Sequence, residues 1–386
     1  MRFPQFWATA AVPVAGLLAL ACCSAADPKD EPTADPAKLV VHEWGTFSTF
    51  SGSDGKNLKF NPYDNDLPDF VHAYLSHASK EGPQGGTISL ETPVIYFYPE
   101  RPLTASVQVE FPKGTLTEWY PHAGRTDTKL TWKGIKVLLE ETVKLPEEKK
   151  ASRYYAARET DAAPLRVTFR EEDRLVTEQD KFLFYRGVGE FDMPLGVRAA
   201  AAGKFTVTWR GKDPATDLIL VRIQGGKVRF QPFRLDQRVK SGVLAEVQVP
   251  REDSTADKLG EAVAKLLVAR GLKEKEAQAM VKTWRSAWFG EEGTRVLYFL
   301  PDEMTAELLP LRVEPKPTAL VRVLVGRHDV LTPEQEKQID SWVAKLTRST
   351  PEDDPGRRAA EEAMAKLGRY QTAAFHAAEA RLKPRR

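Results

Sequence analysis

Five residues of this sequence have side chains suited to acid–base or anion chemistry. They are His42, Glu43, Glu91, His122 and Arg186. Histidine and glutamate side chains can move a proton, and a guanidinium group can bind an anion. A hydrolase needs at least two titratable groups within hydrogen-bond reach of one reacting atom. These residues are therefore the catalytic candidates. They can act together only if the fold brings them close to one reacting atom.

Two of the candidates, His42 and Glu43, are neighbours in the sequence. They begin like the helical zinc-protease motif, but Thr46 stands where the second histidine of that motif would be. Adjacent side chains of a strand point to opposite faces, so we do not expect His42 and Glu43 to form one catalytic pair. The sequence also lacks the Gly-x-x-x-x-Gly-Lys-Ser/Thr loop and the Gly-x-Ser-x-Gly elbow. These absences disfavour nucleotide binding and lipase-type hydrolysis.

Arg186 lies in an expected strand, where alternation places it on one face with Phe182 and Phe184. Burying an unpaired guanidinium group among apolar side chains costs much free energy. We therefore expect Arg186 to have a carboxylate partner, either Glu91 or Glu43. A structural ion pair of this kind is favoured over an anion-binding site.

Metal ligation is the second chemistry that the residue types allow. An Asp- and Asn-rich segment supplies hard oxygen ligands of the kind that Ca²⁺ prefers, although Pro68 interrupts its alternation and a polar turn is the alternative. His72 and His77 are five residues apart on an expected short helix, which separates them by about 140° and does not predict a joint metal site. No other cofactor is predicted. The candidate calcium ligands are Asp54, Asp64 and Asp66.

Aromatic residues beside basic ones form the third group. Trp119 and Tyr120 stand close to His122 in the sequence, and an exposed platform of this kind suits sugars or aromatic ligands. Trp284 and Trp288 are four residues apart on an expected helix, which is typical of core packing. The candidate ligand-binding residues are therefore Trp119, Tyr120 and Arg285.

Short strands must position most of these side chains. Between Leu39 and Val249, β-type runs are separated by Pro, Gly and Asp turns, and in the clearest run Val107, Val109 and Phe111 share one face. Helical patterns follow, one of them opened by Thr332 as an N-cap with Gln335 completing a capping box. We predict an α+β chain with an antiparallel β-sandwich or open barrel followed by C-terminal helices. The predicted regions are a β-rich domain at 39–250 and a mixed α+β region at 251–386, packed on that domain.

Composition excludes several classes of protein. The 386 residues include 56 Lys plus Arg against 54 Asp plus Glu, so no strongly basic field is available to attract nucleic acid. A hydrophobic fraction of 42% is typical of a folded globular chain. Both cysteines precede residue 27. A chain without that segment has no thiol nucleophile and no internal disulfide.

Residues 1–26 have the features of a secretory signal. Arg2 precedes a short apolar run that ends in small residues. Cleavage after Ala26 would release a chain that begins with the flexible spacer 27–38. Alternatively, the residues before Cys23 resemble a bacterial lipobox, in which Cys23 would be acylated. We expect an exported protein of the periplasm or cell envelope that meets the membrane only through such a lipid anchor.

Three motifs carry a resemblance to a known group of proteins. They are His42-Glu-Trp-Gly-Thr-Phe47, Glu91-Thr-Pro-Val-Ile-Tyr-Phe-Tyr98 and Lys181-Phe-Leu-Phe-Tyr-Arg-Gly-Val-Gly189. Together they resemble an uncharacterised exported family that is common in planctomycete genomes. The resemblance implies export and a β-rich core, and it brings no catalytic residue.

Two functions agree best with these observations, and a scaffold tethered to the membrane through Cys23 is the third alternative. The preferred one is an exported envelope protein that binds a ligand or partner of envelope or extracellular origin. The alternative is a hydrolase that acts on such material through the five catalytic candidates. A hydrolase requires these residues to converge in a cleft, whereas a binding protein requires an exposed polar or aromatic platform.

Overall fold

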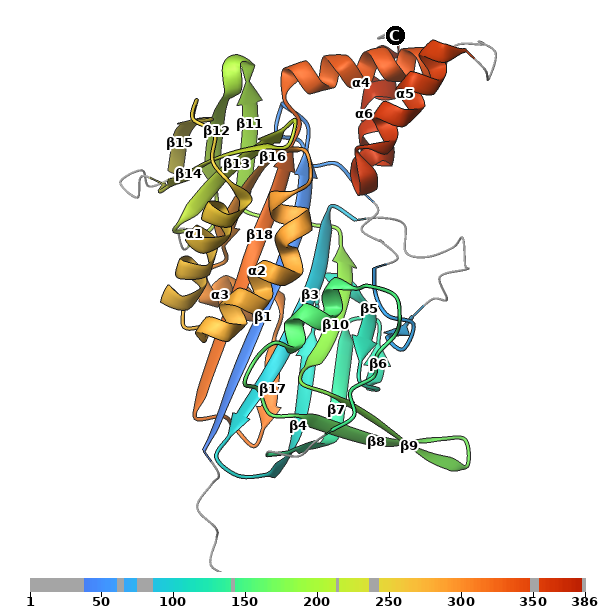
Figure 1. Ribbon diagram of the computed structural model, residues 1–386, viewed down its shortest axis with the longest axis vertical. Coiled ribbons are helices and arrows are strands. Elements are labelled where there is room, and N and C mark those ends of the chain that lie inside the picture. The colour runs from blue at the N-terminus through green and yellow to red at the C-terminus, as the bar shows by residue number, and fades with distance from the viewer. Residues whose placement is uncertain are drawn as a thin grey trace, which may run out of the picture. The chain divides into compact units, whose positions relative to one another are not determined.

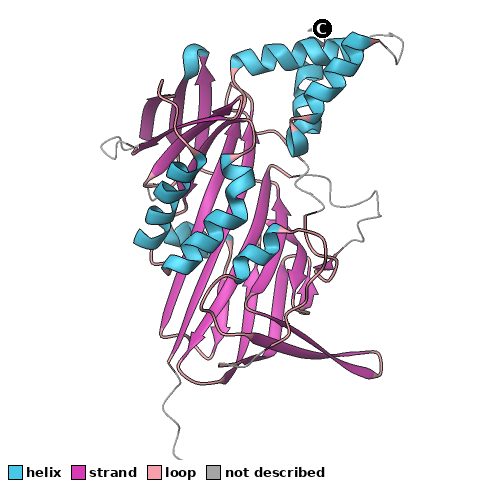
Figure 2. Ribbon diagram, in the orientation of Figure 1, coloured by secondary structure: helices cyan, strands magenta, loops and turns pink. Residues whose placement is uncertain are grey.

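A nine-stranded sheet is the largest element of the fold (Figures 1 and 2). The computed structural model describes residues 38–60, 66–74, 86–139, 143–212, 215–235, 243–347 and 354–383, which belong to one compact unit, Ala37–Arg386. The predicted signal and Cys23 lie outside the described residues, as do Asp64 and His77. In spatial order the strands are β14 (Lys227–Phe233), β13 (Leu218–Gln224), β16 (Gly293–Phe299), β18 (Ala319–Val330), β1 (Leu39–Ser51), β3 (Ile88–Pro99), β10 (Leu183–Gly189), β5 (Gly114–Tyr120) and β2 (His72–Ala73).

Two smaller sheets pack against one face of the large sheet. The three-stranded sheet contains β11 (Leu195–Ala200), β12 (Lys204–Trp209) and β15 (Val243–Gln248). The six-stranded sheet contains β17 (Leu311–Glu314), β4 (Leu103–Glu110), β7 (Lys129–Val137), β8 (Leu165–Glu171) and β9 (Arg174–Asp180), with β6 (Gly124–Thr126) beside β7.

Apolar side chains from the facing sheets form one core. Phe47, Leu90 and Tyr185 of the large sheet share it with Trp132 and Val207 of the smaller sheets. The core also holds the three residues of the alternating run, which are fully buried as their spacing predicted: Val107, Val109 and Phe111. The prediction of an α+β chain with a β-sandwich and C-terminal helices is therefore confirmed.

Most neighbouring strands are antiparallel, but β1 and β18 are parallel. Their register runs from Val40 opposite Ala319 to Ser51 opposite Val330. Because β16 and β18 lie inside the large sheet, strands that follow residue 251 complete a sheet that begins at Leu39. The β-rich and mixed regions of the sequence thus share one core.

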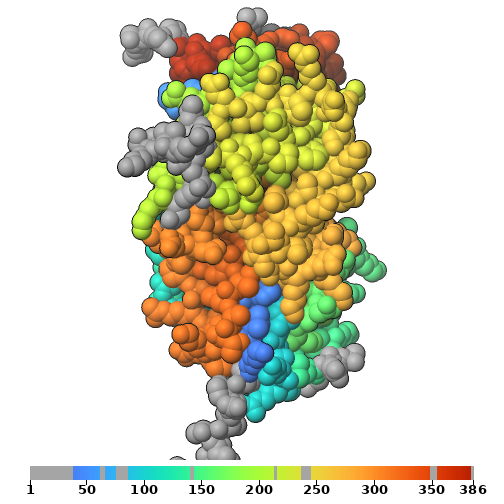
Figure 3. Space-filling model, turned by 90° about the vertical axis from the view of Figure 1, so that its left-hand side faces the viewer, coloured from blue at the N-terminus to red at the C-terminus, as the bar shows by residue number. Residues whose placement is uncertain are grey.

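The helices α1 and α2 cover the opposite face of the large sheet (Figures 1 and 3), the C-terminal helices α4–α6 pack at its end, and α3 lies on the side of the smaller sheets. In the part of the chain that the structure describes, every helix is too short or too polar to span a bilayer. Gln335 and Thr332 make the reciprocal capping bonds predicted at the start of α4. The helices are α1 (Ala256–Ala269), α2 (Glu274–Phe289), α3 (Asp302–Leu308), α4 (Pro333–Leu346), α5 (Pro355–Ala365) and α6 (Gln371–Leu382), with the 3₁₀ helices η1 (Arg153–Arg158), η2 (Ala201–Gly203) and η3 (Gly368–Tyr370).

Two apolar clusters lie beneath these helices. One joins α1 and α2 to the large sheet and includes Trp44, Trp284 and Trp288. The rings of Trp284 and Trp288 are stacked with centroids 5.8 Å apart and are fully buried, which agrees with the core packing expected from their spacing. The other cluster joins the C-terminal helices to Phe50 and Phe60.

Candidate functional site

The candidate catalytic residues occupy different places in the fold. On β1, His42 Nδ1 lies 2.7 Å from Glu276 Oε2 of α2. Glu43 accepts hydrogen bonds from Tyr185 Oη and Arg322 Nε, each at 2.6 Å. The two neighbours therefore point to opposite faces, as expected for a strand, and each is tied to its own partner.

Arg186 has a carboxylate partner, but not one of those expected from the sequence. Its Nη1 and Nη2 each donate to an oxygen of Asp66 at 3.1 Å. Glu91 instead accepts a hydrogen bond from Arg369 Nη1 of η3, and Glu43 lies elsewhere, as described above. The expectation of Glu91 or Glu43 was wrong because no local sequence pattern indicated that Asp66 contacts β10.

Both acids of this region are held in their charged form. Burial alone would raise the pKa of Asp66, but the guanidinium groups of Arg186 and Arg153 hold it well below its usual range. Burial also opposes ionisation of Glu91, but the guanidinium groups of Arg369, Arg153, Arg186 and Arg327 together outweigh it, so the pKa of Glu91 is lowered. A general acid must carry a proton at the working pH, so neither carboxyl group suits that role near neutral pH.

Glu91 and Arg186 are nevertheless brought together. They line a cavity of about 10 Å³ with Glu118, Ser89 and Thr117. A cavity of this volume holds about one water molecule. Within the described residues, Glu91 Oε2 and Arg186 Nε are buried without a hydrogen-bond partner. The site can hold a water molecule, but it has no room for a substrate.

The three motifs of the resemblance meet at this point of the sheet. They lie on the adjacent strands β1, β3 and β10. Thr92, next to Glu91, has a φ of 46°, which is strained for a β-branched residue. A Cβ atom at Gly45 would lie 2.8 Å from Pro93 Cα of β3, so only glycine fits there without a shift. The motifs thus include residues that the packing of these strands requires.

The candidate calcium ligands do not gather in the described residues. Asp54 pairs with Lys56 at 3.3 Å, and Asp66 belongs to the arginine pairs described above. His72 lies on β2 rather than on the expected helix, and its Nε2 is 2.9 Å from Glu178 Oε1. Among the residues in the described ranges, no group of three or more His, Cys, Asp or Glu side chains is placed to hold a metal ion.

The aromatic candidates do not form an exposed platform. Trp119 and Tyr120 are only 9% and 3% exposed. Arg285 lies on the outer side of α2, where its Nη2 is 2.5 Å from Asp257 Oδ1. A ligand at the surface therefore has little access to these aromatic rings.

His122 follows these aromatic residues and borders an open pocket. The pocket has a volume of about 520 Å³ and lies on the six-stranded sheet beside β6, β7 and β8. None of the described residues that line it is Asp or Glu, whereas three of them are cations. The charged and titratable lining residues are His122, Arg125, Lys129 and Lys133.

The His122 ring is fixed in one orientation at the pocket wall. It stacks on Phe169 with centroids 4.0 Å apart, and its backbone N–H donates to Glu178 Oε2 at 2.6 Å. Burial lowers the pKa of His122, and the nearby His72 ring lowers it further. The imidazole is therefore neutral near pH 7, and the positive charge of the pocket comes from the other three side chains.

These cations differ in how far they are already paired. The Arg125 guanidinium carbon lies 3.5 Å from the centre of the Tyr74 ring, and its Nη2 is 3.4 Å from Asp127 Oδ1. Lys129 Nζ is 3.1 Å from Glu110 Oε1. Lys133 has no ion-pair partner among the described residues. Neutral hydrogen-bonding groups complete the lining, namely Gln108, Thr126, Thr131 and Thr168. The pocket can offer a ligand one free ammonium group, two further cations and several hydroxyl groups.

Comparison with known proteins found no match to a family model and no similar curated protein. A functional proposal for this chain therefore depends on its own residues and their geometry.

Proposed function

We propose that this chain is an exported cell-envelope protein that binds an acidic carbohydrate in the pocket beside His122. The observation that carries the proposal is the lining of that pocket, with three cations, four hydroxyl or amide side chains and no carboxylate among its described residues. Export is part of the proposal and is supported by the signal-like residues 1–26, within which Cys23 would be the site of lipid attachment.

Each feature of the pocket suits an acidic sugar. Carboxylate or sulfate groups form their strongest hydrogen bonds with cationic donors. Lys133 has no ion-pair partner in the part of the chain that the structure describes. Sugar hydroxyl groups both donate and accept, as do the threonine side chains around them. A volume of about 520 Å³ lies within the usual range for small-ligand sites. The balanced net charge of the chain gives no support to nucleic acid as the ligand.

The hydrolase alternative has less support. His42 and Glu43 have separate ion-pair partners, and the cavity that Glu91 shares with Arg186 has room for about one water molecule. His122 is the only one of the five catalytic candidates among the lining residues of the open pocket described here. Apart from Arg125, Lys129 and Lys133, no other titratable side chain stands among the described residues that line this pocket.

Calorimetric titration tests the proposal with two sugars of equal length. Tetragalacturonate carries a carboxylate on each residue, and maltotetraose carries none. We expect the protein to bind tetragalacturonate and to bind maltotetraose at least tenfold more weakly. We also expect Lys133→Gln to weaken the binding of tetragalacturonate about fivefold, because one ion pair at about 4 Å in water contributes about 1 kcal/mol.

Lys258→Gln is the matched control, since it removes the same charge from an exposed position on α1. It should leave the affinity unchanged. Equal binding of both sugars would refute the preference for an acidic ligand. Equal weakening by Lys258→Gln and Lys133→Gln would show a general charge effect and would remove the pocket from the proposal.

A further inference from the structure

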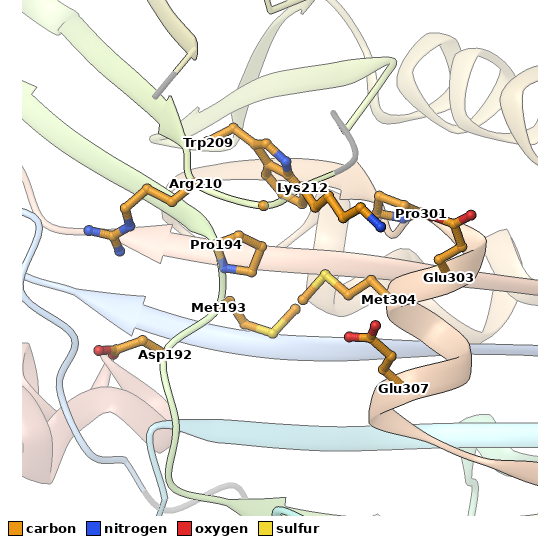
Figure 4. A pocket seen from close by; sticks show the side chains of 11 residues that line it. Asp192, Met193, Pro194, Trp209, Arg210, Lys212, Pro301, Glu303, Met304 and Glu307 are labelled. Carbon is orange, nitrogen blue, oxygen red and sulfur yellow. The ribbon is translucent and has the colours of Figure 1, made fainter. Parts of the chain in front are cut away.

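A second open pocket lies between the three-stranded sheet and α3 (Figure 4). Its volume is about 540 Å³, and it shares no lining residue with the pocket of His122. It is formed by the residues before β11, the end of β12 and the first turns of α3. A ligand of this pocket would therefore not occupy the proposed carbohydrate site.

The floor of this pocket is apolar and adaptable. Met193 and Trp209 are each 2% exposed, and Met304 packs half-buried against the same core. In Figure 4 the side chains of Met193 and Met304 point toward each other beneath Trp209. Methionine side chains are unbranched and flexible, so they can fit apolar groups of several shapes.

Charges of opposite sign stand on either side of Met304. In Figure 4 the Lys212 ammonium group lies above Met304, with the Glu303 carboxylate on the same side, and the Glu307 carboxylate lies below it. Glu303 already has an interaction partner of its own. The Lys212 and Glu307 side chains are exposed, and neither has an ion-pair partner among the described residues. A ligand lying across Met304 would therefore meet a cation at one end and a carboxylate at the other, neither of them paired within the described ranges.

We propose that this pocket binds a short apolar peptide with free termini. The carboxylate of the peptide pairs with Lys212, its ammonium group pairs with Glu307, and its apolar side chains lie on the methionine and tryptophan floor. Both charge contacts are complementary, and the apolar body of the ligand provides the hydrophobic contribution. A volume of about 540 Å³ is within the range of small-ligand pockets.

Blocked dipeptides test each end of the ligand separately. The probes are Leu-Leu, N-acetyl-Leu-Leu and Leu-Leu amide, titrated calorimetrically into the full chain. We expect Leu-Leu to bind in the millimolar range or tighter. Acetylation removes the ammonium group and amidation removes the carboxylate, so each should weaken binding about fivefold, the loss of one solvent-exposed ion pair.

Two variants assign the ends. Lys212→Gln should weaken the binding of Leu-Leu about fivefold. In this variant amidation of the peptide should no longer lower the affinity, whereas acetylation should still impose its penalty, the fivefold loss of affinity. Glu307→Gln should abolish the penalty for acetylation alone. Lys258→Gln is the control for general charge and should change neither penalty. Thermal unfolding of each variant should match the parent chain, because both positions are exposed.

Three results would overturn the inference. One is no binding of Leu-Leu at 20 mM. Another is equal affinity for the free and blocked peptides. The third is a variant that lowers both penalties together, because that result places neither charge at a defined end of the ligand.

Discussion

The buried His328 of β18 gives the fold a defined sensitivity to acid. Its Nδ1 lies 2.8 Å from Thr49 Oγ1, and its Nε2 lies 2.9 Å from Ser51 Oγ, both on β1. One of these hydroxyl groups can donate to the unprotonated ring nitrogen, and the other can accept from the ring N–H. Both nitrogens of the neutral ring are therefore hydrogen-bonded. Burial lowers the pKa of His328 to about 4.

The sign and size of the effect follow from this pKa. In the unfolded chain a histidine titrates near pH 6.5, so above that pH both states are neutral and His328 adds no pH dependence. Below it, the histidine of the unfolded chain binds a proton, whereas the buried His328 ring of the folded chain stays neutral. The free energy of unfolding therefore falls by about 1.4 kcal/mol per pH unit down to about pH 4. Between pH 7 and pH 5 the loss is about 2 kcal/mol.

Urea unfolding at pH 7 and pH 5 measures this loss. We compare the parent chain with His328→Gln, which keeps a polar side chain that does not titrate. The pH-dependent loss of stability should be about 2 kcal/mol smaller in the variant. His376→Gln is the control, because the His376 side chain is 68% exposed, and it should behave like the parent. Equal pH dependence in His328→Gln and the parent would refute the reasoning.

Two further predictions concern export and the ion pair between Glu91 of β3 and Arg369 of η3. Glu91→Gln removes one partner of the buried pair with Arg369 and should lower the free energy of unfolding by about 3 kcal/mol in urea, whereas the exposed Glu100→Gln should change it by less than about 0.5 kcal/mol. A loss as small for Glu91→Gln would contradict a stabilising role of this ion pair. Mass spectrometry of the chain expressed in a bacterial host should find an N-terminus at Asp27 or an acylated Cys23, and a retained Met1 would contradict export.

Local sequence patterns predicted the individual strands and helices of this fold, but they did not predict which of these elements lie next to each other. The alternation of Val107, Val109 and Phe111 indicated a buried strand face because the side-chain period of a strand is visible in a few residues. The parallel pairing of β1 with β18 joins Val40 to Ala319, and no short window of sequence contains both. The partner of Arg186 was missed for the same reason.

The candidate site was predictable only in part. His122 was singled out by its type and by the aromatic residues before it, and it does border an open pocket. Lys129 and Lys133 were not singled out, although they alternate with Thr131 on β7 and so share one face. A lysine on an exposed strand face resembles any solvated lysine. Its role depends on β6 and β8, whose positions the local sequence does not specify.

Protection of lysine side chains would test the central claim most directly. The chain is acetylated briefly with and without saturating tetragalacturonate, and the modification of each lysine is measured by mass spectrometry. A ligand in the proposed pocket should protect Lys129 and Lys133 severalfold, while Lys212 and Lys258 react as in the free protein. Unchanged reactivity of Lys129 and Lys133 under saturating ligand, or equal protection of all four lysines, would contradict an acidic-carbohydrate site beside His122.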